Sequence, residues 1–232
     1  MASANSRLPL TATKFDPMRP SPFAFVVAAL LALFAATIPP AALADADTKL
    51  LLVVGDSISA GYGLTKGVGW VDLLAKRIDA QHFPWRVVNA SISGDTTAGG
   101  RARLPALLDQ YKPAIVVVEL GGNDGLRGGN LRSAKDNLVA MVGSIRKSGA
   151  QAVIVGMRLP PNYGPAYTRE FEALYGDVAK SSGTPLVPFL FAGIGESDEW
   201  FQPDRIHPTA AAQPRLLDNV WSVLSPLLAK TR

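Results

Sequence analysis

The first residue in this chain with clear chemical potential is Ser57, in the motif Gly55-Asp56-Ser57-Ile58 directly after the apolar run Leu50–Val54. A serine hydroxyl attacks an ester only when a neighbouring base takes its proton, and that base works best when a carboxylate fixes its tautomer. A buried strand that ends in a small-residue turn can hold this hydroxyl at the carboxyl edge of a parallel sheet, where open α/β folds bind ligands. We therefore interpret Ser57 as a nucleophile. The alternative is that Asp56 and Ser57 only cap the next segment.

The base must be one of two histidines, His82 and His207. Asp204 precedes His207 by three residues, so a single turn can aim its carboxylate at one ring nitrogen while the other faces Ser57. The alternative is that Asp204 caps the turn and His207 is merely exposed. His82 follows a predicted helix and leads into the amino end of a strand, which is the wrong edge of the sheet, and we interpret it as a surface residue.

Attack on an ester also builds negative charge on the carbonyl oxygen, and each preformed donor to that oxygen contributes ~3 to 4 kcal/mol. Gly94 lacks a Cβ, so its backbone N–H can approach a substrate closely. Asn123 offers a side-chain amide at the end of a predicted strand, and the Ser57 N–H would be a third donor. Gly94 and Asn123 would alternatively be ordinary turn residues, since Gly and Asn dominate turns.

Five apolar runs alternate with segments of helical period, which predicts one three-layer α/β domain with a mainly parallel sheet and right-handed crossovers. The predicted strands span residues 50–54, 86–90, 114–120, 151–156 and 185–190. The helices between and after them are marked by inward apolar residues near 70–78, 104–110, 138–145, 165–178 and 216–228. Breaker-rich loops follow the strands, at 55–63, 91–100, 121–129, 157–164 and 191–209, and they should meet at one edge of the sheet.

This order of motifs, Gly-Asp-Ser, Gly, Gly-x-Asn-Asp and Asp-x-x-His, resembles the SGNH, or GDSL, hydrolase family. Four stretches look like its bacterial periplasmic arylesterase and multifunctional thioesterase I/lysophospholipase branch: Gly55–Gly63, Asn89–Thr97, Glu119–Arg127 and Arg158–Gly164. The resemblance covers nearly all of the chain from Lys49 onward. One departure is Arg205-Ile206 before His207, where relatives often carry an acidic residue or Gly, and it changes the charge at the pocket rim.

The resemblance implies a flavodoxin-like sheet of five parallel strands with helices on both faces. It implies that Ser57 is the nucleophile, His207 the base and Asp204 its orienting acid, and that Ser57, Gly94 and Asn123 form the oxyanion hole. It further implies that two loops flank the acyl chain, with Leu126, Leu159, Pro160 and Tyr163 as substrate-binding residues. This chemistry requires neither a metal nor an organic cofactor.

Length and composition fit this interpretation. The chain has 232 residues and 48% hydrophobic content, enough for one domain with a substantial core. It has no cysteine, which excludes disulfides, thiolate metal sites and lipid attachment at a cleavage-site cysteine. Without residues 1–44, 20 basic and 18 acidic residues remain, and no basic run or aromatic–basic interleaving points to nucleic acid. We expect a monomer.

The amino-terminal segment has the pattern of a secretory signal peptide. Arg19 precedes fourteen consecutive apolar residues, 23–36, and a small-x-small site follows at Ala42-Leu43-Ala44. We therefore expect cleavage after Ala44, an exported protein in the periplasm or medium, and a single domain over residues 45–232. The alternative is a retained membrane anchor. If translation begins at Met18, residues 1–17 are an upstream extension.

Taken together, the sequence predicts a secreted serine esterase that acts on carboxylic esters of small-molecule substrates, with aryl or short-to-medium acyl groups. Acyl thioesters and lysophospholipids are further candidate substrates. A carbohydrate O-acetylesterase would need the same triad and is the first alternative. The second is a noncatalytic exported binding module that has kept the fold.

Overall fold

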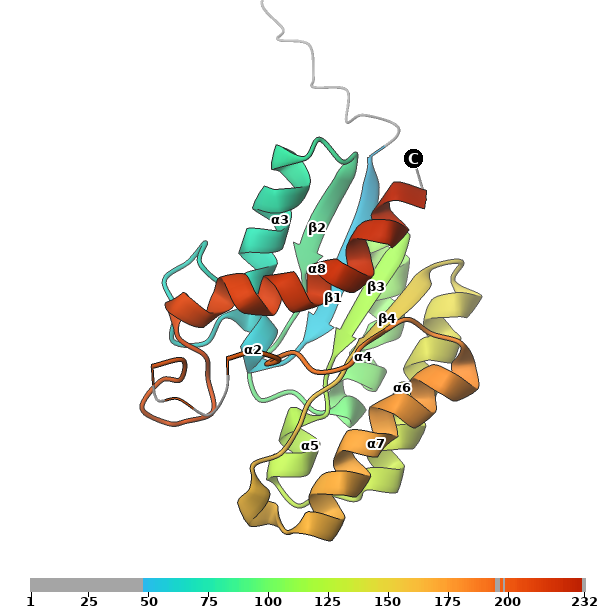
Figure 1. Ribbon diagram of the computed structural model, residues 1–232. Helices are drawn as coiled ribbons and strands as arrows, with labels where there is room; N and C mark the ends of the chain where they lie inside the picture. The colour runs from blue at the N-terminus through green and yellow to red at the C-terminus, as the bar shows by residue number, and fades with distance from the viewer. Residues whose placement is uncertain (1–47, 195–196, 198, 231–232) are drawn as a thin grey trace, which may run out of the picture. The chain divides into compact units, whose positions relative to one another are not determined.

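A computed structural model describes residues 48–194, 197 and 199–230, and the predicted signal peptide, residues 1–44, lies outside them. The described residues contain a five-stranded sheet in the order β2-β1-β3-β4-β5, with every neighbouring pair parallel (Figure 1). Its strands are β1 Lys49–Gly55, β2 Trp85–Asn89, β3 Ile115–Glu119, β4 Gln151–Val155 and β5 Leu186–Val187. This is the flavodoxin-like strand order, and it confirms the predicted fold class.

The central strands form the core of the domain. Leu52 of β1 lies in register between Val88 of β2 and Val116 of β3, and the side chains of Leu52 and Val116 are completely buried. An unbroken apolar run is what a parallel strand covered on both faces requires. The loops that follow the strands therefore emerge from a rigid base at one edge.

Helices cover the two faces of this sheet (Figure 1). α3 Trp70–Ala80 packs against α8 Gln213–Lys230, and α6 Leu131–Lys147 packs between α4 Thr97–Tyr111 and α7 Pro165–Ser182. α7 begins at Pro165 and buries Phe171, Leu174, Tyr175 and Val178, as its apolar period predicts. Among the helices of the described region, none has the length and apolar character needed to cross a membrane.

β5 and several connecting segments differ from the prediction. β5 has two residues where six were predicted, because Pro185 and Pro188 have no N–H with which to extend a ladder. The segments expected to be loops after β1 and β3 contain short helices, α2 Ser57–Ala60 and α5 Gly122–Leu126. A third short helix, η2 Pro161–Tyr163, lies in the loop after β4, and η3 Ala210–Ala212 precedes α8.

Candidate active site

Ser57 is the first residue of α2, immediately beyond the carboxyl end of β1. The Asp56 side chain caps this helix, since the Ile58 N–H donates to Asp56 Oδ1 at 3.0 Å. The preceding Gly55 is required by space, because a Cβ there would lie 2.7 Å from Ser59 Cβ and 2.9 Å from Glu119 Oε2. The cap that was the alternative reading of this motif is present, and it presents the Ser57 hydroxyl at the sheet edge.

The structure brings Ser57, His207 and Asp204 into one hydrogen-bonded chain. His207 Nε2 lies 2.8 Å from Ser57 Oγ, and His207 Nδ1 lies 2.7 Å from Asp204 Oδ2. The other oxygen of Asp204 accepts from the N–H groups of Ile206 and His207, at 2.9 and 3.0 Å. Asp204 thus caps its turn with one oxygen and orients the imidazole with the other, so both readings of this residue hold together.

The charge of Asp204 is set by these contacts. Partial burial opposes its ionisation, but the hydrogen bonds from His207 and Ile206, with the nearby His207 ring, outweigh it and lower the pKa of Asp204 to about 2. The carboxylate is therefore ionised at neutral pH. A carboxylate that accepts from Nδ1–H favours the tautomer of the neutral ring in which Nε2 is the acceptor that faces Ser57.

The turn that carries His207 is tied to the loop after α2. Within the turn, Gln202 N–H donates to the His207 carbonyl at 2.7 Å, and Phe201 and Pro208 form an antiparallel bridge. The Gln202 side chain then donates to the Tyr62 carbonyl at 2.8 Å. The Tyr62 ring packs on the imidazole with 4.5 Å between ring centres, which limits how far the His207 ring can turn.

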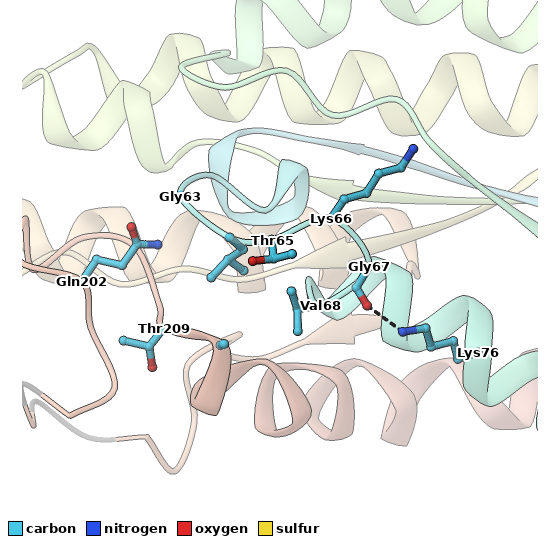
Figure 2. A pocket seen from close by; sticks show the side chains of 10 residues that line it. Gly63, Thr65, Lys66, Gly67, Val68, Lys76, Gln202 and Thr209 are labelled. Carbon is cyan, nitrogen blue, oxygen red and sulfur yellow. Dashed lines mark hydrogen bonds between the residues drawn. The ribbon is translucent and has the colours of Figure 1, made fainter.

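A groove of about 620 Å³ lies beside this junction (Figure 2). Its lining comes from the segment 63–68 and from Lys76, Gln202, Thr209 and Ala210. Lys76 is held against the groove wall, because its ammonium donates to the Gly67 carbonyl at 2.7 Å. None of the four residues predicted to bind substrate lines this groove.

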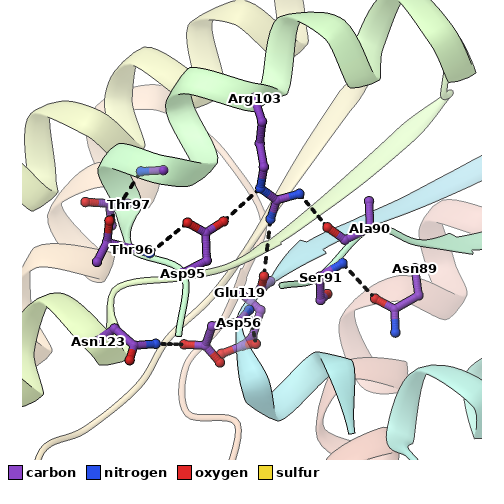
Figure 3. Close-up of polar contacts among 12 residues, drawn as sticks. Asp56, Asn89, Ala90, Ser91, Asp95, Thr96, Thr97, Arg103, Glu119 and Asn123 are labelled. Carbon is purple, nitrogen blue, oxygen red and sulfur yellow. Dashed lines mark hydrogen bonds and ion pairs between the residues drawn. The ribbon is translucent and has the colours of Figure 1, made fainter. Parts of the chain in front are cut away.

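Gly94 and Asn123 come from the loops after β2 and β3. Gly94 has φ +79°, a conformation that side-chain-bearing residues rarely adopt, so the turn itself favours glycine there. Asn123 lies in α5 and donates from Nδ2 to Asp56 Oδ2 at 3.2 Å, which brings it beside the Ser57 turn (Figure 3). Arg127, at the end of α5, donates to the Gly94 carbonyl at 3.0 Å and so joins the two loops.

Further contacts hold these loops to α4, and Figure 3 shows those of Arg103. Asp124 accepts from the N–H and hydroxyl of Thr97 at 2.9 and 2.6 Å, which anchors α5 to the start of α4. Arg103 reaches the loop of Gly94 from α4, pairing with Asp95 at 2.7 Å and donating to the carbonyls of Ala90 and Gly55. One guanidinium therefore connects the ends of β1 and β2.

Two buried carboxyl groups, Asp56 and Glu119, lie side by side at the carboxyl ends of β1 and β3 (Figure 3). Glu119 Oε2 accepts from the Ser59 hydroxyl at 2.7 Å and from the Asp56 N–H at 3.4 Å. Burial raises the pKa of Glu119 well above its usual value, and the charge of Asp56 adds to this. Burial likewise raises the pKa of Asp56, to about 6, against the hydrogen bonds from Ile58 and Asn123. The sequence analysis did not predict this pair. The available signal was Glu119, a single carboxylate at the end of an otherwise apolar strand.

The residues predicted to bind substrate occupy different environments. The Tyr163 hydroxyl donates to the Leu126 carbonyl at 2.9 Å, so the loops after β3 and β4 are joined. Both of these side chains are half-buried, and Pro160 is exposed. Leu159 is buried within the core cluster, and a Cβ on Gly125 of α5 would lie 2.8 Å from it. Leu159 therefore supports α5 from beneath.

His82 lies just beyond α3 and before β2, exposed and at the amino edge of the sheet, as expected. Within the part of the chain that the structure describes, no group of three or more His, Asp or Glu side chains could hold a metal ion. The arrangement at the carboxyl edge offers a hydroxyl, an imidazole, a carboxylate and several N–H donors. Those groups are suited to acyl transfer.

Comparison with known proteins agrees with this arrangement. Residues 53–214 match the model of the GDSL-like Lipase/Acylhydrolase family. Esterase TesA of Pseudomonas aeruginosa is 55% identical over 184 residues, which cover 79% of this chain and 92% of that protein. Thioesterase 1/protease 1/lysophospholipase L1 of Escherichia coli K12 is 43% identical over 80% of this chain and 86% of its own length. An arylesterase of Vibrio mimicus is 42% identical over 76% of this chain and 88% of its own.

Solved structures show the same fold. A crystal structure of TesA, 56% identical, superposes with a TM-score of 0.76 and covers 77% of this chain and 99% of that one. The esterase EstA from Pseudoalteromonas sp., inhibited by monoethylphosphonate, is 36% identical with a TM-score of 0.74, covering 78% of this chain and 99% of its own. This chain therefore belongs to the GDSL-like lipase/acylhydrolase family, the SGNH hydrolases, and is an enzyme that hydrolyses ester bonds.

Proposed function

We propose that this enzyme is a serine esterase that cleaves carboxylic esters with aryl or short-to-medium acyl groups through an acyl-enzyme formed on Ser57. The observation that carries the proposal is the hydrogen-bonded chain from Ser57 through His207 to Asp204, with 2.8 and 2.7 Å between the successive atoms. A neutral imidazole whose Nδ1–H donates to a carboxylate presents an acceptor at Nε2, which is the arrangement that activates a serine hydroxyl.

In the proposed reaction, Ser57 Oγ attacks the substrate carbonyl carbon and its proton passes to His207 Nε2. The resulting oxyanion accepts hydrogen bonds from the N–H groups of Ser57 and Gly94 and from Nδ2 of Asn123. His207 then gives its proton to the departing alkoxide or thiolate, the carbon–oxygen or carbon–sulfur bond breaks, and Ser57 keeps the acyl group. Water, activated by His207, releases the acid and restores the hydroxyl.

The choice of substrate draws on the relatives and on the loops. The similar proteins are named as an esterase, an arylesterase and a thioesterase/lysophospholipase, so acyl thioesters and lysophospholipids join the candidate substrates. Leu126 and Tyr163 are partly buried apolar residues on two loops that a hydrogen bond joins at 2.9 Å. Such side chains suit the apolar acyl part of an ester better than an acetylated sugar.

The test is hydrolysis of p-nitrophenyl esters from acetyl to palmitoyl by the protein isolated after expression of the full chain, beside Ser57→Ala. We expect turnover that is lost in Ser57→Ala, with an optimum at aryl or short-to-medium acyl esters. A marked preference for acetylated sugars would favour the O-acetylesterase, and hydrolysis that survives Ser57→Ala would refute the mechanism.

We also propose that residues 1–44 are a signal peptide removed on export, which leaves a single domain over 45–232. The support is the positively charged flank, the fourteen-residue apolar stretch and the Ala42-Leu43-Ala44 site. Amino-terminal sequencing of the protein from the periplasm or medium should begin at Asp45. A protein that begins at Met1 or Met18 would contradict the proposal.

A further inference from the structure

We infer that Asp56 and Arg127 hold the side-chain amide of Asn123 from its two ends, and that both are positioning residues for the Asn123 donor of the oxyanion hole. The inference rests on the proposed function, in which Asn123 Nδ2 donates to the developing oxyanion. Asp56 contacts the nitrogen end of the amide at 3.2 Å, and Arg127 contacts its oxygen end at 3.4 Å.

The Asp56 contact sets which way the amide faces. Asn123 Nδ2 carries two hydrogens, and donation of one to Asp56 Oδ2 leaves the other for a substrate oxygen. If the amide were turned over, Asn123 Oδ1 would face the carboxylate oxygen, and two acceptors would meet without a hydrogen between them. Asp56 is 2% exposed, so little water competes for this contact, and the low local dielectric strengthens it.

The two oxygens of Asp56 make different contacts. Oδ1 accepts from the Ile58 N–H at 3.0 Å and caps α2, whereas Oδ2 is directed to Asn123. Because Ser57 follows Asp56 directly, one carboxylate fixes both the turn of the nucleophile and the amide that would stabilise the oxyanion. An asparagine at position 56 could keep the cap with its single oxygen, but its NH₂ would then face Asn123.

Arg127 acts from the opposite end. Its Nη2 atom donates to the Gly94 carbonyl at 3.0 Å and lies 3.4 Å from Asn123 Oδ1, so it connects two of the three residues that would hold the oxyanion. A guanidinium beside Oδ1 disfavours the overturned amide, which would bring NH₂ against a cation. Arg127 is exposed, and we therefore expect a smaller effect from it than from Asp56.

The decisive variant is Asp56→Asn, because it keeps the cap and the shape but replaces the acceptor that faces Asn123. With a p-nitrophenyl ester we expect kcat to fall by about 10²- to 10³-fold with little change in KM, as for loss of one oxyanion donor. Asn123→Ala removes that donor directly and should give a similar loss. Adding Asp56→Asn to Asn123→Ala should then lower kcat no further, since no amide remains to be positioned.

A second variant tests the other end. Arg127→Ala should lower kcat by about threefold to tenfold, an expectation smaller than the Asp56 effect because the contact is exposed. This loss should be smaller in the Asn123→Ala background, where only the contact of Arg127 with the Gly94 carbonyl remains. Arg86→Ala is the matched control, because Arg86 is an exposed arginine on β2, outside the contacts of Asn123, and removes the same charge. It should leave kcat and KM unchanged.

The inference is overturned if Asp56→Asn keeps kcat within about twofold of the wild type, or if it lowers kcat equally in the wild-type and Asn123→Ala backgrounds. Circular dichroism checks that each variant is folded. If Asp56→Asn fails to fold, Arg127→Ala is the deciding variant, and a loss of kcat that is equally large with and without Asn123 refutes the inference. Hydrolysis that survives Ser57→Ala would instead refute the proposed function, so the two failures are distinct.

Discussion

The buried carboxyl of Asp56 makes a specific prediction for how the stability of the fold depends on pH. Its pKa is raised from 3.8 to about 6, chiefly by burial. Between these values the folded protein keeps a proton on Asp56 that the unfolded chain has lost. Stability from this group is therefore lost as the pH rises from about 4 through about 6, which is the opposite direction to an ordinary salt-bridged aspartate.

The difference between the folded and unfolded pKa of Asp56 sets how much free energy of unfolding this group contributes. One pKa unit corresponds to about 1.4 kcal/mol, so a rise from 3.8 to about 6 corresponds to about 3 kcal/mol, most of it lost between pH 4 and pH 7. The conversion is justified because Asp56 is 2% exposed. Among charged groups, His207 lowers the pKa of Asp56 and Asp95 raises it.

The assay compares the free energy of unfolding of the wild type and Asp56→Asn in urea, at intervals from pH 4 to pH 7. Asparagine does not titrate, so the stability of Asp56→Asn relative to the wild type should rise by about 2 to 3 kcal/mol over this range. Other groups titrate in both proteins, and most of their contribution cancels in the difference.

The prediction is refuted if the free energy of unfolding of Asp56→Asn relative to the wild type stays constant or falls from pH 4 to pH 7. Glu119→Gln provides an independent check with the same sign, because burial and the Asp56 charge raise the pKa of Glu119.

Two further predictions concern the turn of His207 and the end of α4. Asp204→Asn should lower kcat by about 10²-fold or more, because the new NH₂ faces His207 Nδ1 and favours the wrong tautomer. A normal kcat in this variant would contradict the proposed role of Asp204. Because the pKa of Asp204 is lowered to about 2, the kinetics of the wild type down to pH 4 should show no titration of this carboxylate. Lys112, exposed at the carboxyl end of α4, has φ +44°. Lys112→Gly should raise the free energy of unfolding in urea by about 0.5 to 1 kcal/mol, whereas Lys112→Ala, which keeps the strained Cβ, should not.

Much of the fold follows from local sequence pattern. The apolar runs that became β1, β3 and β4 are bounded by breakers, and parallel strands buried on both faces leave little freedom in register. The meeting of Ser57, Asp204 and His207 could be predicted because all three follow strands whose ends must share an edge. The contact between Asp204 and His207 could be predicted from their spacing of three residues, since a single turn forms it without a partner elsewhere in the chain.

Other features depend on contacts between distant segments. α5 contains two glycines and is held by the Asp124–Thr97 contacts across 27 residues, which local propensity cannot show. The two ends of β5 are set by Pro185 and Pro188, which have no backbone N–H to donate to a neighbouring strand. Glu119 looked like a strand terminus, and its role depends on Ser59 and Asp56, 60 and 63 residues earlier. Contacts of this kind are determined by how distant segments pack, and the periodicity of apolar residues does not predict them.

The order in which the site is assembled along the chain has a consequence for biosynthesis. Ser57 and His207 are 150 residues apart, at nearly opposite ends of the domain. Ser57, the proposed nucleophile, leaves the ribosome early, while His207 comes in one of the last segments before α8. A chain that is still being made, or that is held unfolded by a chaperone, thus has no activated hydroxyl with which to attack the esters around it.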